Sequence, residues 1–90
     1  MKASFKNLPV RASLKGAETT EDLTQIVAEA VYQAATNFED HKLAHRISET
    51  DGEIELTDKE VGVVKRAMTM SNYKFFVQKP ILEALGEKFE

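Results

Sequence analysis

The chain contains no cysteine and only four glycines among its 90 residues. Without cysteine it cannot have a disulfide framework, a thiol nucleophile or a cysteine-ligated zinc site. The glycines are widely spaced, so the glycine-rich loops that cradle phosphates are missing. None of the serines lies in the G-x-S-x-G turn of serine hydrolases. These absences argue against the common classes of small enzyme, and we expect a non-enzymatic protein that uses no cofactor.

Long hydrophobic runs are also missing. No apolar stretch approaches the roughly 18 residues that a membrane span requires. Residues 1–6 carry two lysines where a signal peptide would have its apolar stretch. We therefore expect a cytoplasmic protein that does not bind membranes. A chain that is 42% hydrophobic and 30% charged fits one globular domain over residues 1–90, with a thin core.

Charge is distributed unevenly along the chain, whose net charge is −3. Residues 1–17 contain four bases and no acid, residues 18–60 contain twelve acids and three bases, and residues 61–82 contain four bases and no acid. Solvated faces explain such blocks most simply, because an exposed ion pair contributes only about 0–1 kcal/mol. The alternative is a surface with separate positive and negative patches that binds a partner.

Residues 1–15 are predicted to form an extended N-terminal strand region. Apolar and polar side chains alternate, as in a strand with one buried face. The alternation slips at Asn7–Pro9, where we expect a bend or bulge because proline cannot donate a ladder hydrogen bond. The region pairs either with residues 53–56, which also alternate, or with a second copy of the chain. The candidate edge residues of such a homodimer are Phe5, Val10 and Ala12.

Residues 19–86 are predicted to be helical. Thr19 followed by Asp22 is a pattern typical of a helix N-terminus. An apolar stripe with spacings of three and four then runs from Leu23 to Phe38, which predicts the first helix. A second helix is expected over residues 40–49, followed by a turn at Asp51–Gly52.

A third helix is predicted to begin with a capping box, in which Thr57 and Glu60 satisfy each other's backbone N–H groups. Leu56 can pack on Val61 as the hydrophobic staple of the same motif. Ser71–Asn72 is expected to break this helix.

The last segment, residues 73–86, carries apolar side chains at steps of four, but Pro80 lies within the pattern. Proline fits best in the first turn of a helix. We therefore favour a turn up to Gln78 followed by a short helix, over one kinked helix. Gly86 is expected to end it. The predicted fold class is mainly α with minor β, with three or four short helices and an N-terminal strand.

His41 and His45 lie four residues apart, so on a helix both rings project from one face. Two zinc ligands have this spacing. The glutamate of the metalloprotease pattern is missing between them, and Lys42 opposes a cation. We favour two ordinary surface histidines, and a metal site at this pair is the alternative.

Basic and aromatic side chains alternate between residues 65 and 79. We predict that this segment contacts a protein, because three aromatic residues in four positions are hard to bury on one face. The alternative is a nucleic-acid-associated regulator that holds phosphates and stacks bases. A pI near 5.4 and the acidic block oppose binding to a polyanion. The candidate residues are Lys65, Arg66, Tyr73, Lys74, Phe75, Phe76 and Lys79.

The C-terminal half, over roughly residues 53–86, resembles the ending of small uncharacterised proteins encoded by bacteriophages and prophages. The chain departs from their pattern by placing Pro80 inside the last segment. The resemblance implies a cytoplasmic protein in a bacterial host that binds a host or phage protein. We predict a small interaction protein with a regulatory or assembly role, and a homodimer formed through the N-terminal edge is a further hypothesis. The resemblance rests on Ile54-x-Leu56-Thr57-x-x-Glu60-x-x-x-Val64-Lys65, on Tyr73, and on Val77-x-x-x-Ile81-Leu82-Glu83-x-Leu85.

Overall fold

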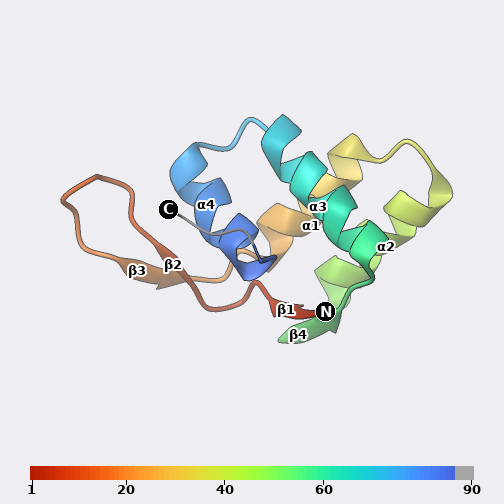
Figure 1. Cartoon of the computed structure of the whole chain (residues 1–90), viewed down its shortest axis with the longest axis horizontal. Coiled ribbons are helices and arrows are strands. Elements are labelled where there is room, and N and C mark those ends of the chain that lie inside the picture. The colour runs from red at the N-terminus through yellow and green to blue at the C-terminus, as the bar shows by residue number, and fades with distance from the viewer. Residues whose placement is uncertain (87–90) are drawn as a thin grey trace.

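The structure is a computed structural model that describes residues 1–86, and these form four helices and two small antiparallel sheets (Figure 1). The prediction of a mainly α fold with minor β is confirmed. The helices are α1 (Thr24–Ala34), α2 (Phe38–Glu49), α3 (Asp58–Met70) and α4 (Phe75–Ala84). The strands are β1 (Lys2–Ser4), β2 (Leu8–Val10), β3 (Thr19–Glu21) and β4 (Glu53–Glu55).

Strands β1 and β4 form the predicted antiparallel ribbon. Ala3 lies opposite Ile54, and both side chains are buried while the flanking positions of β4 are exposed. The pairing continues through Met1 and Leu56. The terminal amine of Met1 donates a hydrogen bond of 2.7 Å to the carbonyl of Leu56, whose N–H donates to the Met1 carbonyl at 2.7 Å. The ribbon thereby leads directly into the start of α3.

The second half of the N-terminal region forms a hairpin that projects from the helices (Figure 1). The chain bends at Lys6–Asn7, and β2 then pairs with β3. The bend or bulge predicted at Asn7–Pro9 is therefore misplaced, since Pro9 lies inside β2 opposite Thr20. A proline is tolerated there because each strand of a two-stranded sheet has a free edge. Thr19 lies opposite Val10 and donates its hydroxyl proton to the Val10 carbonyl at 3.3 Å. The prediction that Thr19 opens the first helix is therefore wrong. Threonine also suits strands, and here a partner strand is within reach.

Helix α1 begins at Thr24, with Leu23 at the N-cap position and no side-chain cap. Asp22 instead accepts a hydrogen bond of 3.0 Å from the Thr24 N–H. This bond lowers the pKa of the Asp22 carboxyl, because it stabilises the charged form.

The boundary between α1 and α2 also differs from the prediction. Helix α1 ends at Ala34, and Asn37 caps α2 by accepting a hydrogen bond of 2.9 Å from the Asp40 N–H. Phe38 is consequently the first residue of α2 instead of the last apolar residue of α1, and its side chain is 84% exposed. An asparagine cap with its favoured extended backbone decides where the second helix begins.

Helix α4 is one continuous helix from Phe75 to Ala84 that contains Pro80. The favoured prediction, a turn up to Gln78 followed by a short helix, is wrong. Proline at this position removes the hydrogen bond to the Phe76 carbonyl. Its ring is buried, however, and α4 packs against β2, so the apolar burial offsets the lost bond. Gly86, with a φ of 99°, ends the helix as predicted.

The core lies around α1, which packs against both α2 and α3. Every helix and the N-terminal segment contribute to it. No helix within residues 1–86 has the length and apolar character needed to cross a membrane. The largest fully buried side chains are Phe5, Val27, Val31, Ile47, Leu56, Val64, Met68 and Ile81.

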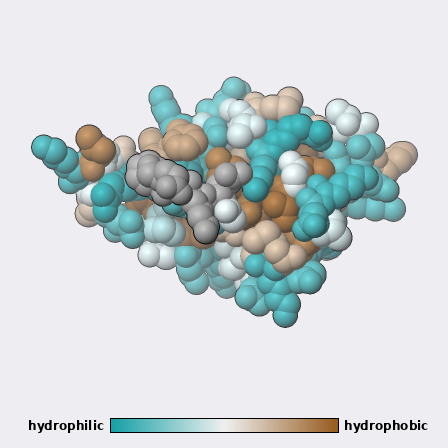
Figure 2. Space-filling view, in the orientation of Figure 1, coloured by the Kyte–Doolittle hydropathy of each residue, from teal (hydrophilic) through white to brown (hydrophobic). Residues whose placement is uncertain are grey.

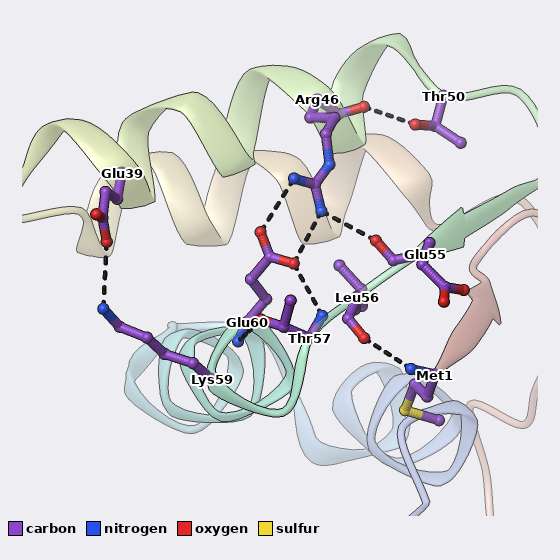
Figure 3. Close-up of polar contacts among 9 residues, drawn as sticks. All are labelled: Met1, Glu39, Arg46, Thr50, Glu55, Leu56, Thr57, Lys59 and Glu60. Atoms are coloured by element: carbon purple, nitrogen blue, oxygen red, sulfur yellow. Dashed lines mark hydrogen bonds and ion pairs between the residues drawn. The ribbon is translucent and has the colours of Figure 1, made fainter.

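A set of polar contacts joins α2 to the start of α3 (Figure 3). The Glu60 carboxylate accepts a hydrogen bond of 2.9 Å from the Thr57 N–H and lies 3.0 Å from both terminal guanidinium nitrogens of Arg46. Arg46 also donates to the Glu55 carbonyl at 3.0 Å. The Thr57 hydroxyl accepts from the Glu60 N–H, so the predicted capping box is confirmed. We call these four residues the Glu60 clamp. Hydrogen bonding from Arg46 lowers the pKa of the Glu60 carboxyl.

Candidate protein-contact surface

The backbone of the loop between α3 and α4 is held by hydrogen bonds from two side chains. Ser71 caps the end of α3 by donating its hydroxyl proton to the Met68 carbonyl at 2.6 Å. Gln78, which is buried, donates from its side-chain amide to the Tyr73 carbonyl at 2.7 Å. The backbone of the loop is therefore anchored to the body of the protein, although the large side chains beside it are exposed.

Exposed apolar side chains gather around this loop. Phe75 is 63% exposed, and Tyr73 and Phe76 are 36% and 38% exposed. Met70, at the end of α3, is 69% exposed. Leu14, in the loop of the β2–β3 hairpin, is 89% exposed. Large apolar side chains at such positions lose favourable burial, which marks the surface as a candidate contact region.

A groove of about 610 Å³ separates the hairpin from α4. Arg11, Ala12 and Leu14 line it from the hairpin side, and Phe75 and Phe76 line it from α4. We call it the hairpin groove. Figure 2 shows hydrophobic groups interrupting the hydrophilic surface on the left, where the hairpin and α4 lie.

A second groove, of about 450 Å³, lies on the other side of the loop. Its walls are α1, through Ala30 and Ala34, and the end of α3, through Ala67 and Met70. Tyr73 closes it on the loop side. The short segment from Met70 to Phe76 is therefore a ridge between two grooves.

The charges along the hairpin groove are paired, and those beside it are not. Arg11 lies 3.9 Å from Glu18 across the hairpin loop, and Lys79 lies 3.2 Å from Glu83 on α4. Lys15 and Lys74, which follow Leu14 and precede Phe75, are exposed and form no ion pair with any of residues 1–86. Two exposed lysines that adjoin groove residues in sequence are therefore available to a partner.

The structure brings together only part of the predicted contact segment. Phe75, Phe76 and Lys79 share the hairpin groove with Ala12, a residue predicted as a dimer edge. Tyr73 belongs to the second groove, and Lys65 lines neither of them. The aromatic residues of the segment are therefore divided between the two grooves.

Arg66 has a partner within the protein. Its guanidinium lies 3.7 Å from the carboxylate of Asp40, whose side chain is only 8% exposed. Asn37 also donates to that carboxylate at 3.2 Å. Because a buried charge needs a counter-charge, Arg66 is better explained as a link between α3 and α2 than as a contact residue.

The predicted edge residues are placed differently from one another. Phe5 and Val10 are 2% and 9% exposed, because β1 and β2 turn these side chains into the core. Neither side chain is accessible to a second copy of the folded chain. Ala12, which lies beyond the end of β2, is exposed.

Sequence reasoning missed Leu14 and Met70. Leu14 continues the alternation of the N-terminal region, which predicts a buried side chain. Ser13 and Gly16, which flank Leu14 and Lys15, are turn signals that could have marked the loop. Met70 follows the apolar stripe of α3 by two residues, a position that turns away from the core.

Comparisons of the chain with protein-family models, curated proteins and solved structures give no match. The resemblance to phage-encoded proteins accordingly stays a hypothesis, and the site has to be interpreted from its own geometry.

Proposed function

We propose that this protein is a non-enzymatic binding module, with a regulatory or assembly role, that holds a segment of another protein in the hairpin groove. The observation that carries the proposal is the clustering of exposed apolar side chains. Of eight large hydrophobic residues exposed within residues 1–86, five lie on the hairpin loop or between Met70 and Phe76. Aromatic side chains exposed on an anchored backbone are typical of the residues that dominate binding energy at protein interfaces.

The proposed occupant is an apolar segment with acidic residues beside its apolar ones. The apolar walls of the groove, Leu14, Phe75 and Phe76, suit the apolar side chains of such a segment. Lys15 and Lys74 adjoin Leu14 and Phe75 in sequence and form no ion pair with residues 1–86, so we expect them to favour carboxylates in the partner. In the setting that the resemblance implies, the partner is a host or phage protein in the bacterial cytoplasm.

Phe75 and Phe38 offer a matched pair for testing this proposal. Each is the first residue of its helix, and both are strongly exposed, at 63% and 84%. Only Phe75 lines the hairpin groove. Phe75→Ser should weaken binding to the partner by at least tenfold, because it removes an aromatic contact, whereas Phe38→Ser should bind like the unchanged protein.

The partner is first captured with tagged protein from bacterial lysate, with and without nuclease and at low and moderate salt. The captured protein is then purified, and its affinity for both variants is measured by calorimetry, after circular dichroism has shown that each variant is folded. Equal affinities for Phe75→Ser and Phe38→Ser would place the contact elsewhere and refute the proposed groove. Capture that requires intact nucleic acid and collapses with rising salt would instead support the alternative, a nucleic-acid-associated regulator.

A further inference from the structure

A second cluster, formed by Tyr32 of α1 and by His41 and His45 of α2, lies apart from both grooves. The Nε2 atoms of the two histidines are 3.2 Å apart. Their ring centroids are 4.7 Å apart, and the rings meet edge to face. His45 is exposed and His41 half-buried, so the space next to these nitrogens is open to solvent.

From this geometry we infer that His41 and His45 chelate a divalent transition-metal ion of the Zn²⁺ or Ni²⁺ class. Two nitrogens that each lie 2.0–2.1 Å from a zinc ion at a tetrahedral angle are separated by roughly 3.3–3.4 Å. The Nε2 atoms are already within a few tenths of an ångström of that separation. With each ring in the tautomer that carries its proton on Nδ1, both Nε2 lone pairs can coordinate the ion, and the present separation means that binding requires little rearrangement of the backbone.

Tyr32 holds the two rings in this arrangement. Its ring centroid lies 5.2 Å from that of His41 and 6.1 Å from that of His45. Imidazole is a preferred ligand of Zn²⁺, Ni²⁺ and Cu²⁺, and such preorganised rings lose little rotational freedom on binding. Residues 1–86 contain no group of three or more possible ligands, so two histidines supply the protein ligands and the remaining positions of the ion stay open.

Exchanging residues 42 and 45 gives a control of identical composition. The double variant Lys42→His/His45→Lys retains two histidines, but places them at adjacent positions that diverge by about 100° around the helix axis. Untagged protein is titrated with ZnCl₂, and separately with NiCl₂, by calorimetry in a buffer that does not chelate metals. We expect one ion per chain for the unchanged protein, and at least a tenfold loss of affinity for the exchanged variant. Equal affinity for both proteins would overturn the inference, because these are the only histidines of the chain.

Tyrosine fluorescence locates the ion independently. The chain has two tyrosines and no tryptophan, so Tyr73→Phe leaves Tyr32 as the only tyrosine and Tyr32→Phe leaves Tyr73. Bound Ni²⁺ should quench the fluorescence of Tyr32, which contacts both histidines, and leave that of Tyr73 unchanged. Equal quenching in both variants would show that the ion binds elsewhere and would refute the site. Neither result depends on the hairpin groove.

Discussion

The start of α3 and the start of α4 are built in different ways. At α3, Thr57 and Glu60 cap the helix, and Arg46 ties the cap to α2. At α4, the N-cap residue is Lys74, which provides no side-chain cap, and the first helical residue is the exposed Phe75. The start of α3 thus gains stability from local polar contacts. The start of α4 is instead held by the buried Gln78, which donates to the Tyr73 carbonyl, and it exposes apolar side chains. Such exposure is typical of a binding surface.

The largest expected effect tests whether α4 is held by its inner face. Ile81 is fully buried, so Ile81→Ala should lower the free energy of unfolding by about 3 kcal/mol through lost burial and the cavity left behind. On the outer face of the same helix, Phe75→Ala should change it by less than about 0.5 kcal/mol. Urea denaturation measures both values. A large loss for Phe75→Ala would mean that this side chain stabilises the fold and is not reserved for a partner.

An intermediate effect tests the Glu60 clamp. Glu60→Gln should cost about 1.5 kcal/mol near pH 7, because it removes the charge that binds the Arg46 guanidinium. The matched control is Glu39→Gln. Glu39 pairs with Lys59 at 3.2 Å, but both side chains are almost four-fifths exposed, so its loss should cost less than about 0.5 kcal/mol.

The same clamp should depend on pH. The pKa of Glu60 is lowered in the folded protein from its ordinary value of 4.5, so its contribution is fully present above pH 4.5. That contribution is lost as the pH falls through the lowered pKa and the folded-state carboxylate becomes protonated. The difference between the unchanged protein and Glu60→Gln should therefore shrink below pH 4.5. A difference that stays constant down to acid denaturation would contradict the role given to the charge.

The smallest expected effects come from changing the N-cap residues of α3 and α4. Thr57→Ala removes a cap and should cost about 1 kcal/mol, whereas Lys74→Ser introduces one and should gain about 0.5 kcal/mol. The backbone of Lys74 is already extended, with a φ of −62° and a ψ of 151°, as a cap requires. Thermal unfolding of both variants gives the comparison. If Lys74→Ser gains nothing, the missing cap is not what distinguishes the start of α4.

Features that depend on neighbours along the chain were predictable from the sequence. The capping box at Thr57, the turn at Gly52 and the helix end at Gly86 follow from short-range rules on hydroxyl caps and positive φ. The β1–β4 ribbon was predictable for a related reason. Only two segments of the chain alternate with period two, and a lone strand needs a partner.

The errors at Thr19 and Pro80 share one cause, which is competition from contacts distant in sequence. Thr19 has the chemistry of a cap, but pairing with Val10 satisfies its backbone better. Pro80 has the chemistry of a helix start, but the burial of its ring where α4 meets β2 keeps it inside a helix. The candidate site shows the same limit. The aromatic residues of α4 could be identified from sequence, but the position of Leu14 across the groove from them could not.

The sequence by itself determined the mainly helical character, the position of the capping box and the spacing of His41 and His45, because each depends on residues within about one turn of one another. Only the tertiary structure decided that the hairpin folds beside α4, that Arg66 pairs with Asp40 and that Tyr32 packs on both histidines. These contacts join segments up to about sixty residues apart. Their free energy comes from burial and charge pairing that no local pattern records.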